Sequence, residues 1–440
     1  MAIERTEFKR RRRLLMQLAG RDAAVVVPAA PERVRNNDAH YPYRQDSDLV
    51  YLSGFHEPEA VLVLVPGRAA GQSILFCRER DLERERWDGP RLGPERAARA
   101  LGLDDAFPIT DIDEILPNLI EGRDKVYYPF GRDPEFDLRV LGWINFLRSQ
   151  ARRGARPPQS LVALGHVLND QRLIKSPREL QLMQQSADIA ARAHNRVLDL
   201  LKPGLMEYQV EAELLRTFRE QRAVPAYESI VAAGANACIL HYRSNNAELR
   251  PGDLLLVDAG AEFECYASDI TRTWPISGRF SAPQRAIYDL VLKAQRAAID
   301  AAQVGRVWTD IHDAALQVIV RGLVKLGLLK GSVAKIIKEE RYKEFFPHKS
   351  GHWLGLDVHD VGEYRIDGLP RVLEPGMVLT VEPGIYISPR NKEVDAIWRG
   401  IGVRIEDDIV VSNEGPLDLT AGVTKDPDEI ERRLNLPLAA

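Results

Sequence analysis

The sequence predicts a protein of two domains, an α/β domain followed by a domain of long helices and strand-like runs. At 440 residues the chain is too long for one ordinary hydrophobic core. Roughly the first 170 residues mix helical and strand-like segments, whereas the later part begins with two helices and continues with strand-like runs that further helices interrupt. The texture changes around Lys175, Ser176 and Pro177. We therefore expect the domains to span residues 1–174 and 175–440.

In the first domain, a polar helix is expected over residues 4–19, before strands at AAVVVPA, AVLVLVP and SILFC. In the second domain, Ser176 can cap a helix and Pro177 suits its first turn, so a helix begins there and ends near Leu201. Further helices are expected over residues 208–221, 281–302 and 309–327. The strand-like runs of this domain are ESIVAAG, LLLVDAG, YASDITRTW, VLTVEPG and GVRIEDDIVV.

Composition excludes several classes of protein. The chain is 45% hydrophobic and 28% charged, and it has no apolar run near the ~18 residues that a membrane helix needs. Its net charge of -4 gives no reason to expect nucleic acid as a partner. Cys77, Cys238 and Cys265 have no CxxC spacing and form an odd set, which is typical of reduced thiols in a cytoplasmic protein.

Two aspartates indicate a charged site in the second domain. Asp258 ends the apolar run LLLV, and Asp269 follows in YASDITRTW. If the chain turned at Phe263 and Glu264, these two carboxylates would stand directly opposite each other, and they would repel unless a proton or a cation lay between them. The alternative is two separate, exposed turn carboxylates. The spacing alone does not decide between these interpretations.

The C-terminal part of the chain adds three more candidate ligands. Glu382 ends the run VLTV, Glu406 lies in GVRIEDD, and His352 follows a glycine. Arg404 shares a strand face with Glu406 and can orient it. Four carboxylates and one imidazole at strand edges favour Mn²⁺ or a related divalent ion over structural zinc. Two such ions could share carboxylates and activate a hydroxide, so the pattern predicts hydrolysis.

The other histidines divide into two groups. His241 and His359 lie in loops beside strands, where a lone histidine is more often structural. Next to the carboxylates, however, we favour a role in oxyanion stabilisation or proton transfer. His166, His194 and His312 have no neighbouring acidic pattern, and we expect them to be surface or helix-packing residues.

These motifs together closely resemble the bacterial Xaa-Pro aminopeptidases (aminopeptidase P) of the pita-bread metallopeptidase family. The resemblance rests on HWLGLDVHDVG, LEPGMVLTVEPGIYI, RGIGVRIEDDIVV, ILHY and LVDAGAEFECYASDITRTWP, and in the first domain on YPYRQDSDLVYLSGFHEPEAVLVL and RDLERERWDGPRLG. It covers nearly the whole chain. It implies an α/β N-terminal domain that is ribonuclease-H-like and serves oligomerisation and substrate access, followed by a pita-bread catalytic domain of the α+β class.

The resemblance also implies a site with two divalent metal ions, usually Mn²⁺. Its ligands would be Asp258, Asp269, His352, Glu382 and Glu406, with Asp269 and Glu406 bridging both ions. A metal-bridging hydroxide would attack the carbonyl before proline, and Glu382 would pass a proton towards the proline nitrogen.

Substrate contacts follow from the same resemblance. His241 and His359 would hold the carbonyl and the oxyanion, His348 would line the proline subsite, and Arg404 would steady Glu406. The substrates would be peptides with proline at the second position. By analogy the protein would form a homotetramer, with a dimer as the alternative, and Trp87 would reach a neighbour's active site. The other interpretation of Trp87 is an aromatic residue buried in its own domain.

Two alternatives remain at this point. A prolidase would use the same five ligands to cleave Xaa-Pro dipeptides, although the segment YPYRQDSDLVYLSGF favours the aminopeptidase. A pita-bread protein without metals would be a binding module or a metal-free hydrolase such as creatinase. Such proteins have lost ligands, whereas all five positions are intact here.

Overall fold

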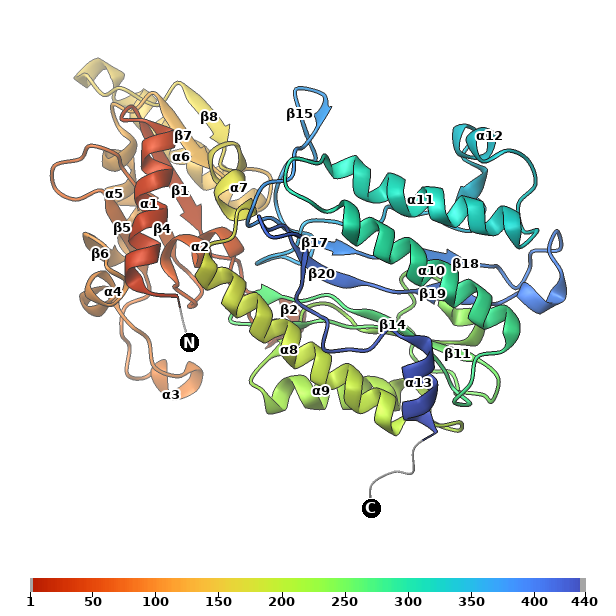
Figure 1. Cartoon of the computed structure of the whole chain (residues 1–440). Coiled ribbons are helices and arrows are strands. Elements are labelled where there is room, and N and C mark those ends of the chain that lie inside the picture. The colour runs from red at the N-terminus through yellow and green to blue at the C-terminus, as the bar shows by residue number, and fades with distance from the viewer. Residues whose placement is uncertain (1–2, 436–440) are drawn as a thin grey trace. The chain divides into compact units, whose positions relative to one another are not determined.

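The computed structural model describes residues 3–435 and divides into two compact units (Figure 1). The first unit is Met1–Arg172 and the second is Leu173–Ala440, so the division falls two residues before the predicted boundary. Within the described residues, no helix is both long enough and apolar enough to pass through a membrane.

The first unit is built on a six-stranded sheet with the order β6-β5-β4-β1-β7-β8. The strands β1, β4 and β5 are antiparallel neighbours, whereas β7 and β8 run parallel to β1. The strands of the unit are β1 (Ala23–Pro28), β2 (Val34–Asn36), β3 (Ala39–His40), β4 (Val61–Leu64), β5 (Ser73–Cys77), β6 (Asp105–Pro108), β7 (Lys125–Tyr128) and β8 (Ser160–Ala163). The three predicted strands are β1, β4 and β5. The α/β class predicted for this unit is confirmed.

Helices cover this sheet. They are α1 (Arg5–Ala19), α2 (Ser47–Ser53), α3 (Glu85–Asp88), α4 (Pro94–Leu101), α5 (Ile112–Ile120), α6 (Pro134–Ser149) and α7 (Gly165–Leu173). The predicted helix at 4–19 is α1. One apolar core lies between the sheet and α5 and α6, where Val26, Val63, Leu116 and Trp143 are buried together.

The second unit places its strands between two pairs of helices, α8 with α9 and α10 with α11 (Figure 1). Its helices are α8 (Pro177–Leu200), α9 (Glu207–Glu220), α10 (Ala282–Ala301), α11 (Trp308–Lys325), α12 (Val333–Lys338) and α13 (Pro427–Leu434). The first four match the predicted helices. The Ser176 hydroxyl accepts a bond from the Glu179 backbone and the Glu179 carboxylate accepts one from the Ser176 backbone, which confirms the predicted start of α8.

Short antiparallel strands carry the candidate carboxylate ligands or lie next to them. They are β9 (Val224–Pro225), β10 (Ile230–Ala233), β11 (Leu254–Asp258), β12 (Ala261–Phe263), β13 (Tyr266–Ala267), β14 (Thr271–Pro275), β15 (Arg365–Ile366), β16 (Leu369–Pro370), β17 (Val378–Val381), β18 (Gly384–Tyr386), β19 (Gly402–Arg404), β20 (Asp407–Val410) and β21 (Leu417–Asp418). A large apolar core fills the space between these strands and the helices. The predicted α+β class is confirmed.

The predicted register of the hairpin that carries the two aspartates is wrong. Asp258 pairs with Thr271, and Phe263 pairs with Tyr266, so the turn residues are Glu264 and Cys265. Both have left-handed backbones, with φ of 51° and 67°. Such turns are normally signalled by Asn-Gly or Asp-Gly, and neither is present here. Because Asp269 lies two residues from Thr271, it shares the face of Asp258 diagonally instead of standing opposite to it.

Candidate metal centre

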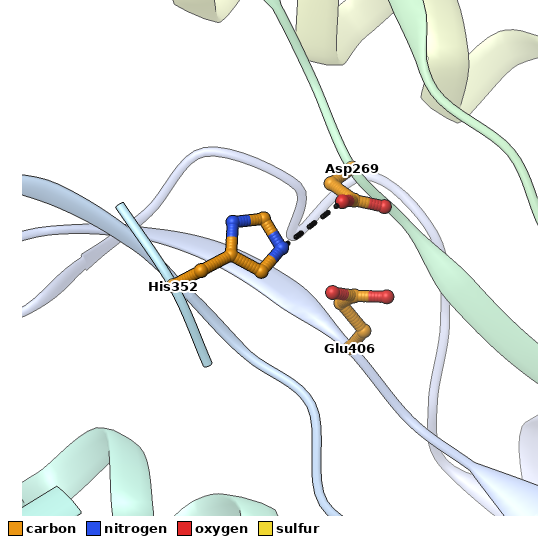
Figure 2. A group of neighbouring side chains, drawn as sticks. All are labelled: Asp269, His352 and Glu406. Atoms are coloured by element: carbon orange, nitrogen blue, oxygen red, sulfur yellow. Dashed lines mark ion pairs between the residues drawn. The ribbon is translucent and has the colours of Figure 1, made fainter. Parts of the chain in front are cut away.

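Three of the predicted ligands converge on one point in the second unit. Asp269, His352 and Glu406 each present one ligand atom, and these atoms lie within 4.8 Å of one another. Figure 2 shows the imidazole of His352 facing the two carboxylates, which come from other segments of the chain. The Nε2 atom of His352 is 3.5 Å from Oδ2 of Asp269. The sequence therefore brings together residues up to 137 positions apart, since Glu406 and Asp269 are that far along the chain.

The backbone explains how the two carboxylates meet. Glu406 lies between β19 and β20, and its N–H donates to the carbonyl of Thr271 at 3.1 Å, which joins its strand to β14. The Thr271 hydroxyl donates to Oε2 of Glu406 at 2.5 Å. On the other side, the backbone N–H of Asp269 donates to the buried carboxyl group of Asp408 at 3.0 Å. Both carboxylates are thus fixed at the backbone and not only at their side chains.

His352 is oriented by its own segment. Its backbone N–H donates to the Thr380 hydroxyl at 3.1 Å, and its Nδ1 lies 2.9 Å from the carbonyl oxygen of Trp353. A carbonyl can only accept, so Nδ1 carries the proton and Nε2 is directed at the carboxylates. Burial acts against the charged ring, yet Asp269 and Glu382 raise the pKa of His352 to about 9. Neutral Nε2 is the form that binds a metal ion.

Asp258 joins this group through Tyr227, a residue that sequence reasoning missed. The Tyr227 hydroxyl donates to Oδ1 of Asp258 at 2.6 Å and also contacts Oδ1 of Asp269. It precedes β10 in a segment without periodic or acidic pattern, so only the fold reveals that it lies between the two carboxylates. The Tyr227 hydroxyl has one proton, so it can donate to only one of these two carboxylate oxygens at a time.

Arg404 differs from its prediction. Its Nη2 donates to Oδ2 of Asp258 at 2.6 Å, and its Nε donates to the Thr271 hydroxyl at 3.1 Å. The carboxylate that it holds directly is therefore Asp258, and it reaches Glu406 only through Thr271. The prediction assumed neighbours on one strand face, whereas β19 ends at Arg404 and Glu406 pairs with Thr271 beside β14.

Glu382 lies at the edge of the cluster, directly after β17. Its Oε1 is 4.0 Å from Nε2 of His352, and its Oε2 is 3.8 Å from Nδ1 of His348. Burial raises the pKa of Glu382 to about 7, against the opposing effects of His352 and Arg404. Glu382 can therefore hold or release a proton near neutral pH.

The pKa values of several carboxyl groups in the site are raised. Burial raises the pKa of Asp258, and burial together with the charges of Asp269 and Glu382 raises the pKa of Glu406 well above its usual value. Groups that resist ionisation in this way are stabilised by a proton or by a bound cation. Oxygen ligands with one imidazole are the donor set of divalent ions such as Mn²⁺. The residues therefore fit a divalent cation.

The remaining predicted histidines lie around this cluster. The His348 Nε2 is 2.8 Å from the Tyr386 hydroxyl, which in turn accepts from Nη1 of Arg404 at 3.0 Å. The ring of His359 packs edge-on against His352, with ring centroids 4.3 Å apart. His241 is exposed, and it lies close enough to help lower the pKa of His348 and of His359, in which burial has the largest effect.

The three histidines that we expected to be surface or helix-packing residues differ in how deeply they are buried. His194 is fully buried in α8 and bonds to the carbonyl oxygen of Ala259 at 2.9 Å, while His166 is exposed. His312 is partly buried on α11, 3.0 Å from the Ser350 hydroxyl and beside Phe346. All three lie on helices, His166 on α7, His194 on α8 and His312 on α11.

Trp87 lies on α3 of the first unit, with 87% of its surface exposed. The interpretation of Trp87 as an aromatic residue buried in its own domain is therefore wrong.

Comparison with known proteins decides the family. Residues 181–413 match the model of metallopeptidase family M24, and residues 8–127 match that of the aminopeptidase P N-terminal domain. The chain belongs to metallopeptidase family M24. Its first unit therefore carries the N-terminal domain of aminopeptidase P, and its second unit carries the pita-bread domain of the M24 family. This confirms the predicted fold class.

Individual M24 relatives match over nearly the full chain. The Xaa-Pro aminopeptidase of Escherichia coli (strain K12) is 44% identical, over 98% of this chain and 97% of its own length. A solved structure of the Pseudomonas aeruginosa aminopeptidase PepP has a TM-score of 0.97 and 57% identity, and covers 98% of each chain. Aminopeptidase P of E. coli, solved with the inhibitor Pro-Leu, has a TM-score of 0.95 and 44% identity over 99% of both chains.

Proposed function

We propose that this protein is an Xaa-Pro aminopeptidase, a metallopeptidase that removes the first residue of peptides whose second residue is proline. The observation that carries this conclusion is the buried convergence of Asp269, His352 and Glu406 in an M24 chain. Relatives similar over the full length are named Xaa-Pro aminopeptidases, which favours this activity over the dipeptidase and binding-module alternatives.

The metal ligands of the proposed site are Asp258, Asp269, His352, Glu382 and Glu406. Together they would hold two divalent ions, which we propose to be Mn²⁺. Support comes from the oxygen-rich donor set and from the raised pKa values of the carboxyl groups, which a cation would relieve. Such ions, when bound, make water acidic enough to act as a nucleophile near neutral pH.

We assign proton transfer and substrate binding to other side chains around the cluster and to Glu382. Glu382 can take a proton from the attacking water and deliver it to the proline nitrogen, because its carboxylate lies at the edge of the ligand cluster. His241 and His359 would hold the substrate carbonyl and the oxyanion that develops from it. His348, fixed by the Tyr386 hydroxyl, would line the subsite for proline.

Arg404 is proposed to position ligands and not to contact the reacting atoms. It neutralises Asp258 directly and fixes Glu406 through the Thr271 hydroxyl. Because an arginine stays charged at any working pH, this support does not vary with pH.

A solved relative supports a preference for substrates longer than a dipeptide. A dipeptide that begins with proline is what remains of a tripeptide after its first residue has been removed, and such a dipeptide, Pro-Leu, is the inhibitor in one solved E. coli structure. The bond before proline is a tertiary amide whose nitrogen carries no hydrogen, and this nitrogen must take up a proton to leave as the amine when the bond is cleaved.

We also propose a homotetramer, with a dimer as the alternative, and a cytoplasmic location. Trp87 would act across the subunit interface at a neighbour's site. Its high exposure supports this role, because a large aromatic side chain at 87% exposure contributes little to its own fold.

The deciding experiment compares two substrates on chelator-treated protein, with and without added Mn²⁺. We expect Mn²⁺-dependent release of the first residue from an Xaa-Pro-Xaa tripeptide, with an Xaa-Pro dipeptide a much poorer substrate. The reverse preference would identify a prolidase. No hydrolysis of either peptide would favour a binding module.

A further inference from the structure

A charged network lies behind the metal centre and takes no part in the chemistry proposed above. Arg272 and Asp407 are both fully buried, and Nη2 of Arg272 donates to Oδ1 of Asp407 at 2.6 Å. A buried ion pair is costly unless every polar atom finds a partner. The remaining partners therefore show what this pair holds together.

Arg272 binds the backbone on both sides of the metal centre. Its Nη1 donates to the carbonyl oxygen of Glu406 at 2.6 Å and to that of Thr271 at 3.0 Å. Its Nη2 donates to the carbonyl oxygen of Val423 at 2.9 Å. The guanidinium group of Arg272 therefore joins three separate segments. One is β14, the second carries Glu406, and the third is the C-terminal segment that carries Val423.

Asp407 binds Arg272, and both of its carboxylate oxygens accept further hydrogen bonds that fix the carboxylate in place. Its Oδ1 also accepts from the Thr420 hydroxyl at 2.8 Å. Its Oδ2 accepts from the side-chain amide of Gln295 on α10 and from Nζ of Lys425. Lys425 itself is tied to Asp418 by a bond of 3.0 Å. The C-terminal segment 418–425 therefore supplies one cation and one anion, Lys425 and Asp418, to a network in which the four charges balance.

We infer that Arg272 is a positioning residue that sets the separation of the Asp269 and Glu406 carboxylates, and that Asp407, itself bound by Lys425, holds Arg272 in place. The inference rests on the proposed metal centre. Asp269 lies two residues before Thr271, and Glu406 is bonded to Thr271, so the two backbone carbonyls bound by Arg272 belong to the segments that carry both carboxylates. The C-terminal segment is by this route part of the support of the metal centre, although it contains none of the proposed ligands.

The test uses Lys425→Met in the full chain, because an Arg272 variant would remove the buried guanidinium beside Asp407 and leave the carbonyl of Val423 without its donor. The matched control is Arg433→Met: Arg433 ties the C-terminal helix α13 to Asp199 and Asn195 and does not contact Asp407. The readouts are the Kd and stoichiometry of Mn²⁺ binding by calorimetry on chelator-treated protein, and the thermal unfolding midpoint of the same metal-free samples.

We expect Lys425→Met to weaken Mn²⁺ binding about tenfold or more, as loss of residues that support metal ligands does. Arg433→Met should leave the Kd near the wild-type value even where it lowers the unfolding midpoint, and Lys425→Arg should restore most of the affinity. Equal Mn²⁺ affinity in Lys425→Met and the wild type would overturn the inference and leave the proposed function intact. A wild-type protein that binds no Mn²⁺ would overturn both.

Discussion

At the scale of single residues, the candidate metal centre is a set of carboxylates each restrained by a different neighbour. Asp258 is held by Tyr227 and Arg404, and Glu406 by Thr271. These hydrogen bonds come from the protein's own residues, and they fix where the carboxylate oxygens lie. A metal ion that binds His352 and these carboxyl groups must displace the protons that they carry.

This gives a first prediction, on pH. Because the pKa of His352 is about 9 in the folded, metal-free protein and about 6.5 when unperturbed, the ring is protonated in the metal-free site between these values. Mn²⁺ must displace that proton. Its affinity should therefore rise about tenfold per pH unit from pH 7 to about 9, measured by calorimetry in buffers of different ionisation enthalpy.

The same shift predicts the stability of the metal-free protein. A histidine whose folded pKa is raised stabilises the fold below about pH 6.5, and this contribution is lost as pH rises through about 9. The unfolding midpoint of chelator-treated protein should fall between pH 7 and 9, whereas saturation with Mn²⁺ should remove most of that fall. A Mn²⁺ affinity independent of pH would contradict the proposed role of His352.

A second prediction separates ligands from substrate contacts. Asp269→Ala should abolish both metal binding and activity, because it removes a carboxylate at the centre of the cluster. His359→Ala should lower turnover by about a hundredfold or more, as for a lost oxyanion donor, and should leave the Mn²⁺ stoichiometry unchanged. Loss of metal from the His359 variant would show that its role has been misassigned.

At the scale of elements, the structure shows which local signals can be interpreted from sequence. Helix starts were predictable, because a cap such as Ser176 acts within its own first turn. The hairpin register was not, because Glu264 and Cys265 adopt left-handed turn conformations without the usual residues. Candidate ligands could be found as acids at strand ends. Tyr227 could not, because only tertiary structure places it between Asp258 and Asp269.

The third prediction concerns the cap of α8. Ser176→Ala removes the hydroxyl that accepts from the Glu179 backbone and should lower the free energy of unfolding by about 1 kcal/mol. Ser176→Thr keeps an acceptor at this position and should cost clearly less. Urea unfolding of both variants measures the difference. Equal losses in the two variants would show that the hydroxyl does not act as the cap.

At the scale of the whole molecule, the proposed assembly gives a role to an exposed aromatic residue. Trp87 exposes 87% of its surface on a four-residue helix, where it does little for the stability of its own unit. In the proposed oligomer, that ring would close a neighbouring substrate site. No composition or charge pattern in the sequence reveals such a contact, because it depends on surfaces of two separate chains.

The fourth prediction tests this assignment. Trp87→Ala should leave the unfolding midpoint unchanged, because no packing is lost, and should raise KM for a tripeptide several-fold. Leu138→Ala on α6 is the matched control, since Leu138 is also an exposed apolar residue, at 70%, and no role at the substrate site is proposed for it. The oligomeric state of each variant is measured by light scattering.

If Trp87 acts across subunits, activity per chain should also fall on dilution of the wild type, as the oligomer dissociates by mass action. Constant specific activity through dissociation, with an unchanged KM in Trp87→Ala, would place the complete substrate site within one chain.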